Sequence, residues 1–121
     1  MKILVAEDEP ILLRIIELRL KKDGHEVIIC ADGREALARI EDWRPDLIIA
    51  DIMMPFVSGL EIVGAVKKGN TRIPIIILSG MEQENVVLEA FQLGADDYMT
   101  KPFSLNELSV RVKRFAVHTK S

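Results

Sequence analysis

Four short apolar runs, separated by amphipathic segments, dominate the pattern of hydrophobic and polar positions along this chain. Each run is continuous rather than alternating and is rich in β-branched residues, which is typical of strands buried on both faces of a parallel sheet. The runs are Ile3–Ala6, Val27–Cys30, Leu47–Ala50 and Ile75–Leu78, and Asp97–Thr100 is a weaker fifth candidate.

The segments between the runs repeat apolar residues every three or four positions, which is the period of a helix packed along one side. Ile11, Ile15 and Leu18 mark the first of these segments. We therefore predict helices over about residues 10–22, 33–43, 59–68, 82–93 and 105–117.

Residues that start and stop helices stand at these boundaries. Pro10 suits a first helical position, and Asp32, Ser58 and Ser104 are each followed three positions later by a glutamate, as in a capping box. Three glycines are expected to take a left-handed conformation at helix ends, namely Gly24, Gly69 and Gly94.

Five strands alternating with five helices predict an α/β fold. Short crossovers between such elements are right-handed and place helices on both faces of a parallel sheet. We expect a flavodoxin-like doubly wound (βα)5 domain with a five-stranded sheet of order 2-1-3-4-5. A length of 121 residues suits one domain, which we expect to cover residues 1–121.

Composition narrows the setting of this domain. No apolar stretch approaches the ~20 residues of a membrane span. The single cysteine, Cys30, allows no intramolecular disulfide and fits a reducing cytosol, where it is expected to be a buried apolar residue. A formal charge of −3 has the wrong sign for a dedicated nucleic-acid binder. We expect a cytoplasmic protein with no membrane segment and no direct nucleic-acid binding.

Charged and hydroxyl side chains follow the predicted strands at the edge where parallel α/β sheets bind ligands. Glu7 and Asp8 follow the first strand, and Asp51 follows the third. Ser79 follows the fourth strand, and Lys101 the fifth. Because the first and third strands are neighbours in this order, three carboxylates meet and repel one another, and Mg²⁺ would offset their charge. With the lysine and the hydroxyl, this group can hold a phosphoryl group.

The phosphoryl group could arrive on a bound ligand or on the protein itself. A nucleotide or flavin phosphate needs a glycine-rich loop after the first strand, whereas the segment from Glu7 to Pro10 is acidic and lacks glycine. Asp51 can instead act as a nucleophile and form an aspartyl phosphate. Glu9 is interpreted mainly as a charge that stabilises the dipole of the first helix.

Two other functions stay open at this point. One is a flavodoxin-like small-molecule or cofactor-binding domain. The other is a metal-dependent phosphatase with an aspartyl nucleophile, although Met53 stands where such enzymes usually carry a second carboxylate.

Together the motifs resemble the receiver domains of two-component response regulators, and the resemblance covers Ile3 to about Phe115. It rests on the acidic pair Glu7–Asp8, the segment Asp51–Pro55 with Gly59 downstream, Ser79–Gly80, and the run from Gly94 to Phe103. Each motif is weak alone, but all of them in order, each at a strand end, are specific. Glu7 replaces the commoner aspartate, Ser79 the commoner threonine and Gly80 the commoner alanine.

The resemblance implies a role for each residue around the acidic pair. Asp51 matches the phosphoacceptor, and Lys101 matches the lysine that pairs first with the acceptor and then with the phosphate. Asp8 matches a direct Mg²⁺ ligand, and Glu7 matches a ligand that acts mainly through water. The backbone carbonyl of Met53 matches the third protein ligand of Mg²⁺.

The resemblance also implies a switch. Ser79 matches the hydroxyl that turns toward the phosphoryl group, Tyr98 matches the aromatic side chain whose rotamer follows, and the Lys101–Pro102 peptide is expected to be cis. The domain is then a phosphoacceptor with Mg²⁺-dependent self-phosphorylation and self-dephosphorylation chemistry rather than a conventional enzyme. Self-dephosphorylation is expected to be slow, because the apolar Met53 and Met81 cannot orient a water.

Partners follow from the same resemblance. The donor would be a sensor histidine kinase or a phosphotransfer protein, and the output would pass through the last two helices and the last strand to a partner or to a linked effector domain, for which this chain leaves no room. Receivers joined to winged-helix DNA-binding domains look most similar and tend to form symmetric dimers through this face. Candidate residues for charge pairs across such a dimer are Asp96, Asp97, Glu107 and Arg111. The helix predicted over 82–93 has no basic residue, however, which leaves a different partner open.

Overall fold

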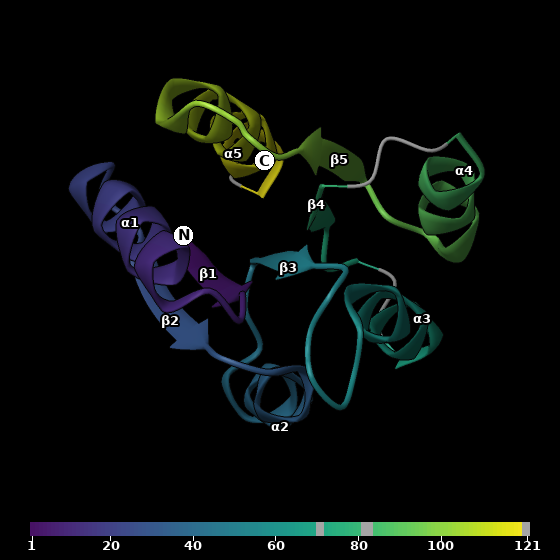
Figure 1. Cartoon of the computed structure of the whole chain (residues 1–121). Coiled ribbons are helices and arrows are strands. Elements are labelled where there is room, and N and C mark those ends of the chain that lie inside the picture. Colours follow the sequence, from purple (N-terminus) through teal and green to yellow (C-terminus); the bar gives the residue numbers. More distant parts are fainter. Residues whose placement is uncertain (70–71, 81–83, 120–121) are drawn as a thin grey trace.

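The computed structural model describes residues 1–69, 72–80 and 84–119, in which strands and helices alternate along the chain (Figure 1). The strands are β1 (Lys2–Ala6), β2 (Glu26–Cys30), β3 (Leu47–Asp51), β4 (Ile75–Ser79) and β5 (Asp97–Thr100). The helices are α1 (Pro10–Lys22), α2 (Gly33–Trp43), α3 (Gly59–Gly69), α4 (Glu84–Leu93) and α5 (Leu105–Thr119).

The strands form one parallel sheet of order β2-β1-β3-β4-β5, which confirms the predicted fold. Strand β1 lies between β2 and β3, since Ile3 pairs with Val27 of β2 on one side and with Leu47 of β3 on the other. The chain reverses its winding direction between β1 and β3. The carboxyl ends of these two strands therefore form the crevice in which this class of fold binds ligands.

The helices cover both faces of the sheet, with α1 and α5 on one face and α2, α3 and α4 on the other (Figure 1). Successive side chains of a strand point to opposite faces, so each strand contributes to two cores. In β1, Leu4 packs on the α2–α4 side, whereas Ile3 and Val5 pack on the α1–α5 side. This double burial is why the strands appear in the sequence as continuous apolar runs.

The predicted caps hold where the structure tests them, with one exception. Asp32 accepts a hydrogen bond from the Glu35 N–H at 2.9 Å, and the Ser104 hydroxyl accepts one from the Glu107 N–H at 3.0 Å. Ser58 and Glu61 form a reciprocal capping box. Gly24 and Gly94 take left-handed conformations with φ of 96° and 115°. The prediction for Gly69 was wrong, because this glycine is the last residue of α3 itself.

The apolar positions that mark α1 in the sequence are not those that the helix buries. Leu13, Ile16 and Leu20 face the core, whereas Ile11 is 77% exposed and Leu18 is 52% exposed. Apolar residues stand on two sides of this helix, so spacing alone cannot tell which side packs on the sheet. Contact with β1 and α5 decides it.

Two glycines allow the loop between β3 and α3 to pack closely. A Cβ atom added at Gly33 would lie 2.0 Å from the carbonyl oxygen of Val57, and one added at Gly59 would lie 2.4 Å from the carbonyl oxygen of Asp51. In the same loop Phe56 has a φ of 69°, which is unusual for an aromatic residue. The Arg34 guanidinium lies 3.6 Å from the centroid of its ring.

The edge of the sheet opposite the crevice carries Trp43, the last residue of α2. Lys2 of β1 donates a hydrogen bond from its Nζ to the carbonyl oxygen of Trp43 at 2.5 Å, and this Nζ lies 4.9 Å from the centroid of the indole ring. A cavity of about 520 Å³ opens between the ends of α2 and α3 at this edge. Its apolar lining includes Leu37, Ile40 and Val66.

Candidate functional site

The residues predicted to form a site come together at the carboxyl ends of the strands. Asp51 and Ser79 are the last residues of β3 and β4, while Glu7 and Asp8 follow β1 directly and Lys101 follows β5 directly. Sheet hydrogen bonds continue past the strand ends, since the Glu7 N–H bonds to the Cys30 carbonyl and the Lys101 N–H to the Ser79 carbonyl. These two hydrogen bonds hold the backbone of Glu7 and Lys101 in line with the sheet.

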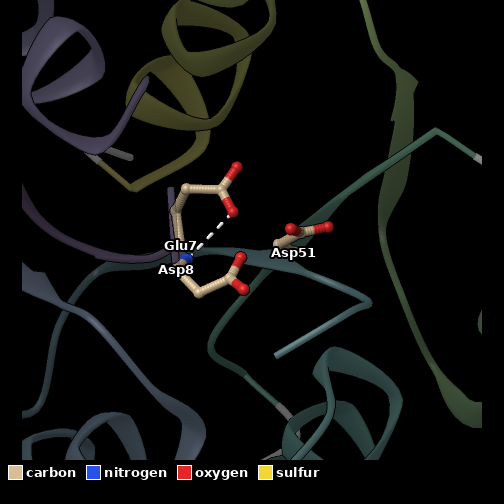
Figure 2. A group of neighbouring side chains, drawn as sticks. All are labelled: Glu7, Asp8 and Asp51. Atoms are coloured by element: carbon tan, nitrogen blue, oxygen red, sulfur yellow. Dashed lines mark hydrogen bonds between the residues drawn. The ribbon is translucent and has the colours of Figure 1, made fainter. Parts of the chain in front are cut away.

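Three carboxylates form the centre of the site. One carboxylate oxygen from each of Glu7, Asp8 and Asp51 lies within 4.8 Å of the others, and Figure 2 shows the Glu7 and Asp8 carboxylates on the side that faces Asp51. Glu7 is 0% exposed and Asp51 is 4% exposed, whereas Asp8 is open to solvent. Closely spaced oxygen ligands with access to water suit Mg²⁺, which keeps several of its water ligands in protein sites. The donor set thus fits the predicted cation.

Lys101 contacts two of these three carboxylates and also the carboxylate of Glu9. Its Nζ lies 2.6 Å from Glu7 Oε1, 3.1 Å from Asp51 Oδ2 and 3.1 Å from Glu9 Oε2. The Lys101–Pro102 peptide is cis, which confirms the prediction from the sequence. The three N–H donors of the ammonium thus face three carboxylates.

The electrostatics of the site follow from burial and from crowded like charges. Burial, together with the neighbouring Asp51, raises the pKa of Glu7 from 4.5 to about 8, although Lys101 opposes the shift. Burial alone would lower the pKa of Lys101, but hydrogen bonds to Glu7, Asp51 and Glu9 raise it above its ordinary value. The lysine is therefore fully charged at neutral pH, and a cation placed near Glu7 would favour the ionised carboxylate.

The contact between Glu9 and Lys101 was missed from the sequence. Glu9 is the N-cap residue of α1, but its side chain makes no capping hydrogen bond and bonds to Lys101 instead. The carboxylate thus has a partner that the sequence analysis did not name, while its interaction with the helix dipole stays a prediction. The one signal in the sequence was that Lys101 directly follows β5, at the same edge of the sheet as the loop between β1 and α1 that carries Glu9.

The loop after Asp51 carries the other predicted metal ligand. Met53 follows Asp51 by two residues, and its N–H donates to Asp51 Oδ1 at 3.4 Å. Met53 is 61% exposed, which leaves an apolar residue at the rim of the site. Met81, predicted to act with Met53, lies outside the described residues.

The two predicted switch residues occupy different environments. Ser79 is completely buried at the end of β4, between the ends of β3 and β5. Tyr98 is half-buried in β5, where its ring lies 6.5 Å from that of Phe91 in α4 and packs against the core on that face of the sheet. The tyrosine thus links the strand to α4.

The four residues predicted to pair charges across a dimer have partners within the chain. The Arg111 guanidinium lies 2.6 Å from Asp97 and 3.9 Å from Glu107, and Asp96 lies 3.0 Å from Lys67. Asp97 is 8% exposed, so its contact with α5 is part of the fold. A pairing across a dimer stays a prediction and would require these contacts to be exchanged.

Membrane crossing is a separate question. In the described part of the chain, no helix combines the length and apolar character that a membrane span requires.

Comparisons with known proteins agree with this geometry. The family model of the response regulator receiver domain matches residues 3–113. The alkaline phosphatase synthesis transcriptional regulatory protein PhoP of Bacillus subtilis is 40% identical over 112 residues, which are 93% of this chain and 47% of the relative. The transcriptional regulatory protein TrcR of Mycobacterium tuberculosis is 38% identical over 93% of this chain and 44% of its own length. The chain therefore spans about half the length of the curated relatives it matches.

Solved structures are similar over nearly the whole chain. The receiver domain of the Francisella response regulator 1452 has a TM-score of 0.93 and 36% identity, with 98% of each chain covered. The BeF3-activated receiver domain of DrrB, a Thermotoga maritima protein, has a TM-score of 0.88 and 33% identity, with 95% of this chain and 96% of that chain covered.

Proposed function

Because this chain belongs to the response regulator receiver domain family, we propose that it is a phosphorylation switch in which Asp51 accepts a phosphoryl group from a phosphohistidine. The observation that carries the proposal is the position of Asp51. It ends β3, is almost fully buried, pairs with Lys101 at 3.1 Å and shares a cluster with Glu7 and Asp8. The donor is a sensor histidine kinase or a phosphotransfer protein.

The transfer forms one bond and breaks another. A carboxylate oxygen of Asp51 forms a bond to phosphorus, the P–N bond of the phosphohistidine breaks, and the imidazole nitrogen keeps the electron pair. When bound by Glu7, Asp8, Asp51 and the Met53 carbonyl, Mg²⁺ would neutralise charge on the transferring group. Lys101 donates hydrogen bonds to the phosphoryl oxygens, where negative charge develops.

The proposed response is a shift between two states of the same fold. A phosphoryl group adds charge and acceptor oxygens, to which the Ser79 hydroxyl and Lys101 can turn. Movement at Ser79 changes the surroundings of Tyr98, a residue of β5 whose ring lies next to that of Phe91 in α4. The surface of α4, β5 and α5 then differs between the states, and it signals to a partner or to a linked effector domain. A dimer through this surface is one form of that signal.

The rival cofactor-binding function has less support. The first loop is acidic and holds its carboxylates at the position where a flavin or nucleotide phosphate would bind. The cavity between α2 and α3 lies at the opposite edge of the sheet.

The test is phosphorylation by acetyl phosphate, followed by intact mass measurement. In this reaction the Asp51 oxygen attacks phosphorus and acetate leaves, so a phosphoryl adduct is expected that depends on Mg²⁺. Asp51→Asn should lose the adduct, while Asp42→Asn, which changes an exposed carboxylate on α2, should keep it. No adduct on the native chain, or an undiminished adduct on Asp51→Asn, would rule out the proposal.

A further inference from the structure

The ammonium group of Lys101 is held from the solvent side by Glu9. Two of its three carboxylate partners are buried, since the side chain of Glu7 is 0% exposed and that of Asp51 is 6% exposed. The third, Glu9, has a side chain that is 63% exposed. Lys101 therefore sits between an inner pair of carboxylates and an outer carboxylate on the first loop.

The inner carboxylates are fixed by further contacts. The second oxygen of Glu7 accepts the Asp8 N–H at 3.0 Å, and the second oxygen of Asp51 accepts the Met53 N–H at 3.4 Å. Glu9 stands where a side chain could cap α1, yet it makes no capping bond and reaches Lys101 instead. The role of an N-cap residue therefore does not explain why Glu9 contacts Lys101.

We propose that Glu9 is a positioning residue that restrains Lys101 while Asp51 is unphosphorylated, and that the incoming phosphoryl group displaces it. This inference rests on the proposed function, because it concerns the lysine that stabilises the transferring group. Glu9 is not one of the three carboxylates grouped at the candidate cation site. It acts on the reaction only through Lys101.

The order of release follows from burial. A lysine has three N–H donors and no acceptor, so each new hydrogen bond to a phosphoryl oxygen requires a carboxylate to let go. Glu7 loses most by release, because its buried Oε1 would give up the hydrogen bond from Lys101 and a buried acceptor left unpaired is costly. Asp51 gives up its charge when its oxygen is esterified. The Asp51 contact therefore passes to the phosphoryl group, and Glu9, which can return to water at little cost, is the further carboxylate that a second phosphoryl oxygen replaces.

Removal of the restraint should therefore favour the phosphorylated state. Glu9 is the solvent-exposed partner of this pair, with a side chain that is 63% exposed against 19% for Lys101, and solvent weakens such an ion pair, so we expect an increase of about two- to fivefold. The increase should appear in the initial rate of phosphorylation by acetyl phosphate and in the affinity for beryllofluoride, which occupies the phosphoryl position. Both measurements require Mg²⁺ and the native chain as reference.

Three variants separate the restraint from simple charge repulsion. Glu9→Gln keeps the shape and removes the charge, while Glu9→Asp keeps the charge but is one methylene shorter. Aspartate is also a preferred N-cap residue, so its carboxylate should bond to the first turn of α1 rather than to Lys101. Glu26→Gln makes the same change of net charge at the exposed start of β2, at the opposite edge of the sheet. We expect both Glu9 variants to be faster and Glu26→Gln to match the native chain.

The measurements are intact mass for the rate and isothermal titration calorimetry for beryllofluoride, with circular dichroism to confirm that each variant is folded. An increase for Glu9→Gln alone would assign the effect to repulsion of the anionic donor and would overturn the inference. Unchanged or slower rates for both Glu9 variants would also overturn it. If the native chain takes up no phosphoryl group, the proposed function fails and the inference falls with it, which is distinct from failure of the restraint alone.

Discussion

Gly59, the first residue of α3, offers a quantitative test of how closely this helix approaches the strand that carries Asp51. A Cβ atom at this position would lie 2.4 Å from the Asp51 carbonyl oxygen, 2.8 Å from its carbonyl carbon and 3.0 Å from the Cα of Ile52. All three atoms belong to the main chain. To bring the shortest distance from 2.4 to an ordinary 3.4 Å, helix and strand must separate by about 1 Å.

The expected cost follows from this displacement. Overpacking of a well-packed interior costs ~1–3 kcal/mol, and Gly59→Ala should lower the free energy of unfolding by that amount. Gly64→Ala is the matched control, because Gly64 lies inside the same helix and an added Cβ would meet nothing within 4 Å. That variant should raise the free energy of unfolding by ~0.5–1 kcal/mol, since alanine is the better helix former.

Urea unfolding followed by circular dichroism measures both variants against the native chain. The reasoning requires effects of opposite sign in one helix. If Gly59→Ala is as stable as the native chain, or if the two variants shift together, the close approach of α3 to Asp51 is refuted.

Other predictions concern buried titratable groups. Since the pKa of Glu7 is raised from 4.5 to about 8, the folded state keeps a proton that the unfolded chain releases. In the absence of Mg²⁺ the free energy of unfolding should therefore fall as pH rises from 4.5 to about 8. Glu7→Gln should reduce this dependence on pH, and an unchanged dependence in the variant would contradict the assignment to Glu7. Asp97→Asn should weaken the pair with Arg111 and lower the free energy of unfolding by about 1–2 kcal/mol. Urea unfolding measures this change, with the exposed Asp42→Asn as control. Cys30, 1% exposed and with its pKa raised by burial to about 12, should resist iodoacetamide until urea unfolds the chain, and rapid labelling of the folded protein would show that it is accessible.

The sequence was most informative where burial and charge conflict. A run such as Leu47–Ala50 must be buried on both faces, so a carboxylate directly after it, Asp51, is either paired or functional. The same reasoning applies to Glu7 after β1 and Lys101 after β5. Topology then brings these residues to one edge, and the structure places all of them within reach of the lysine.

Side-chain choices between equivalent partners could not be predicted in this way. The Glu9 carboxylate could bond either to the N-terminus of α1 or to Lys101, and spacing along the chain does not indicate which partner it takes. Leu18 and Leu20 are both apolar residues of α1, yet only Leu20 is buried, because the contact with the sheet selects the face. At the end of α2 the left-handed position is taken by Arg44, a residue with no preference for that conformation.

The position of Trp43 determines what intrinsic fluorescence can report. It is the only tryptophan of the chain, and it lies beside Lys2 at the edge of the sheet opposite the crevice that holds Asp51. Its emission should change when the chain unfolds and stay constant when Asp51 is phosphorylated. One optical signal can therefore compare the stability of the two forms without responding to the switch itself, whereas a probe of switching must be introduced near Tyr98.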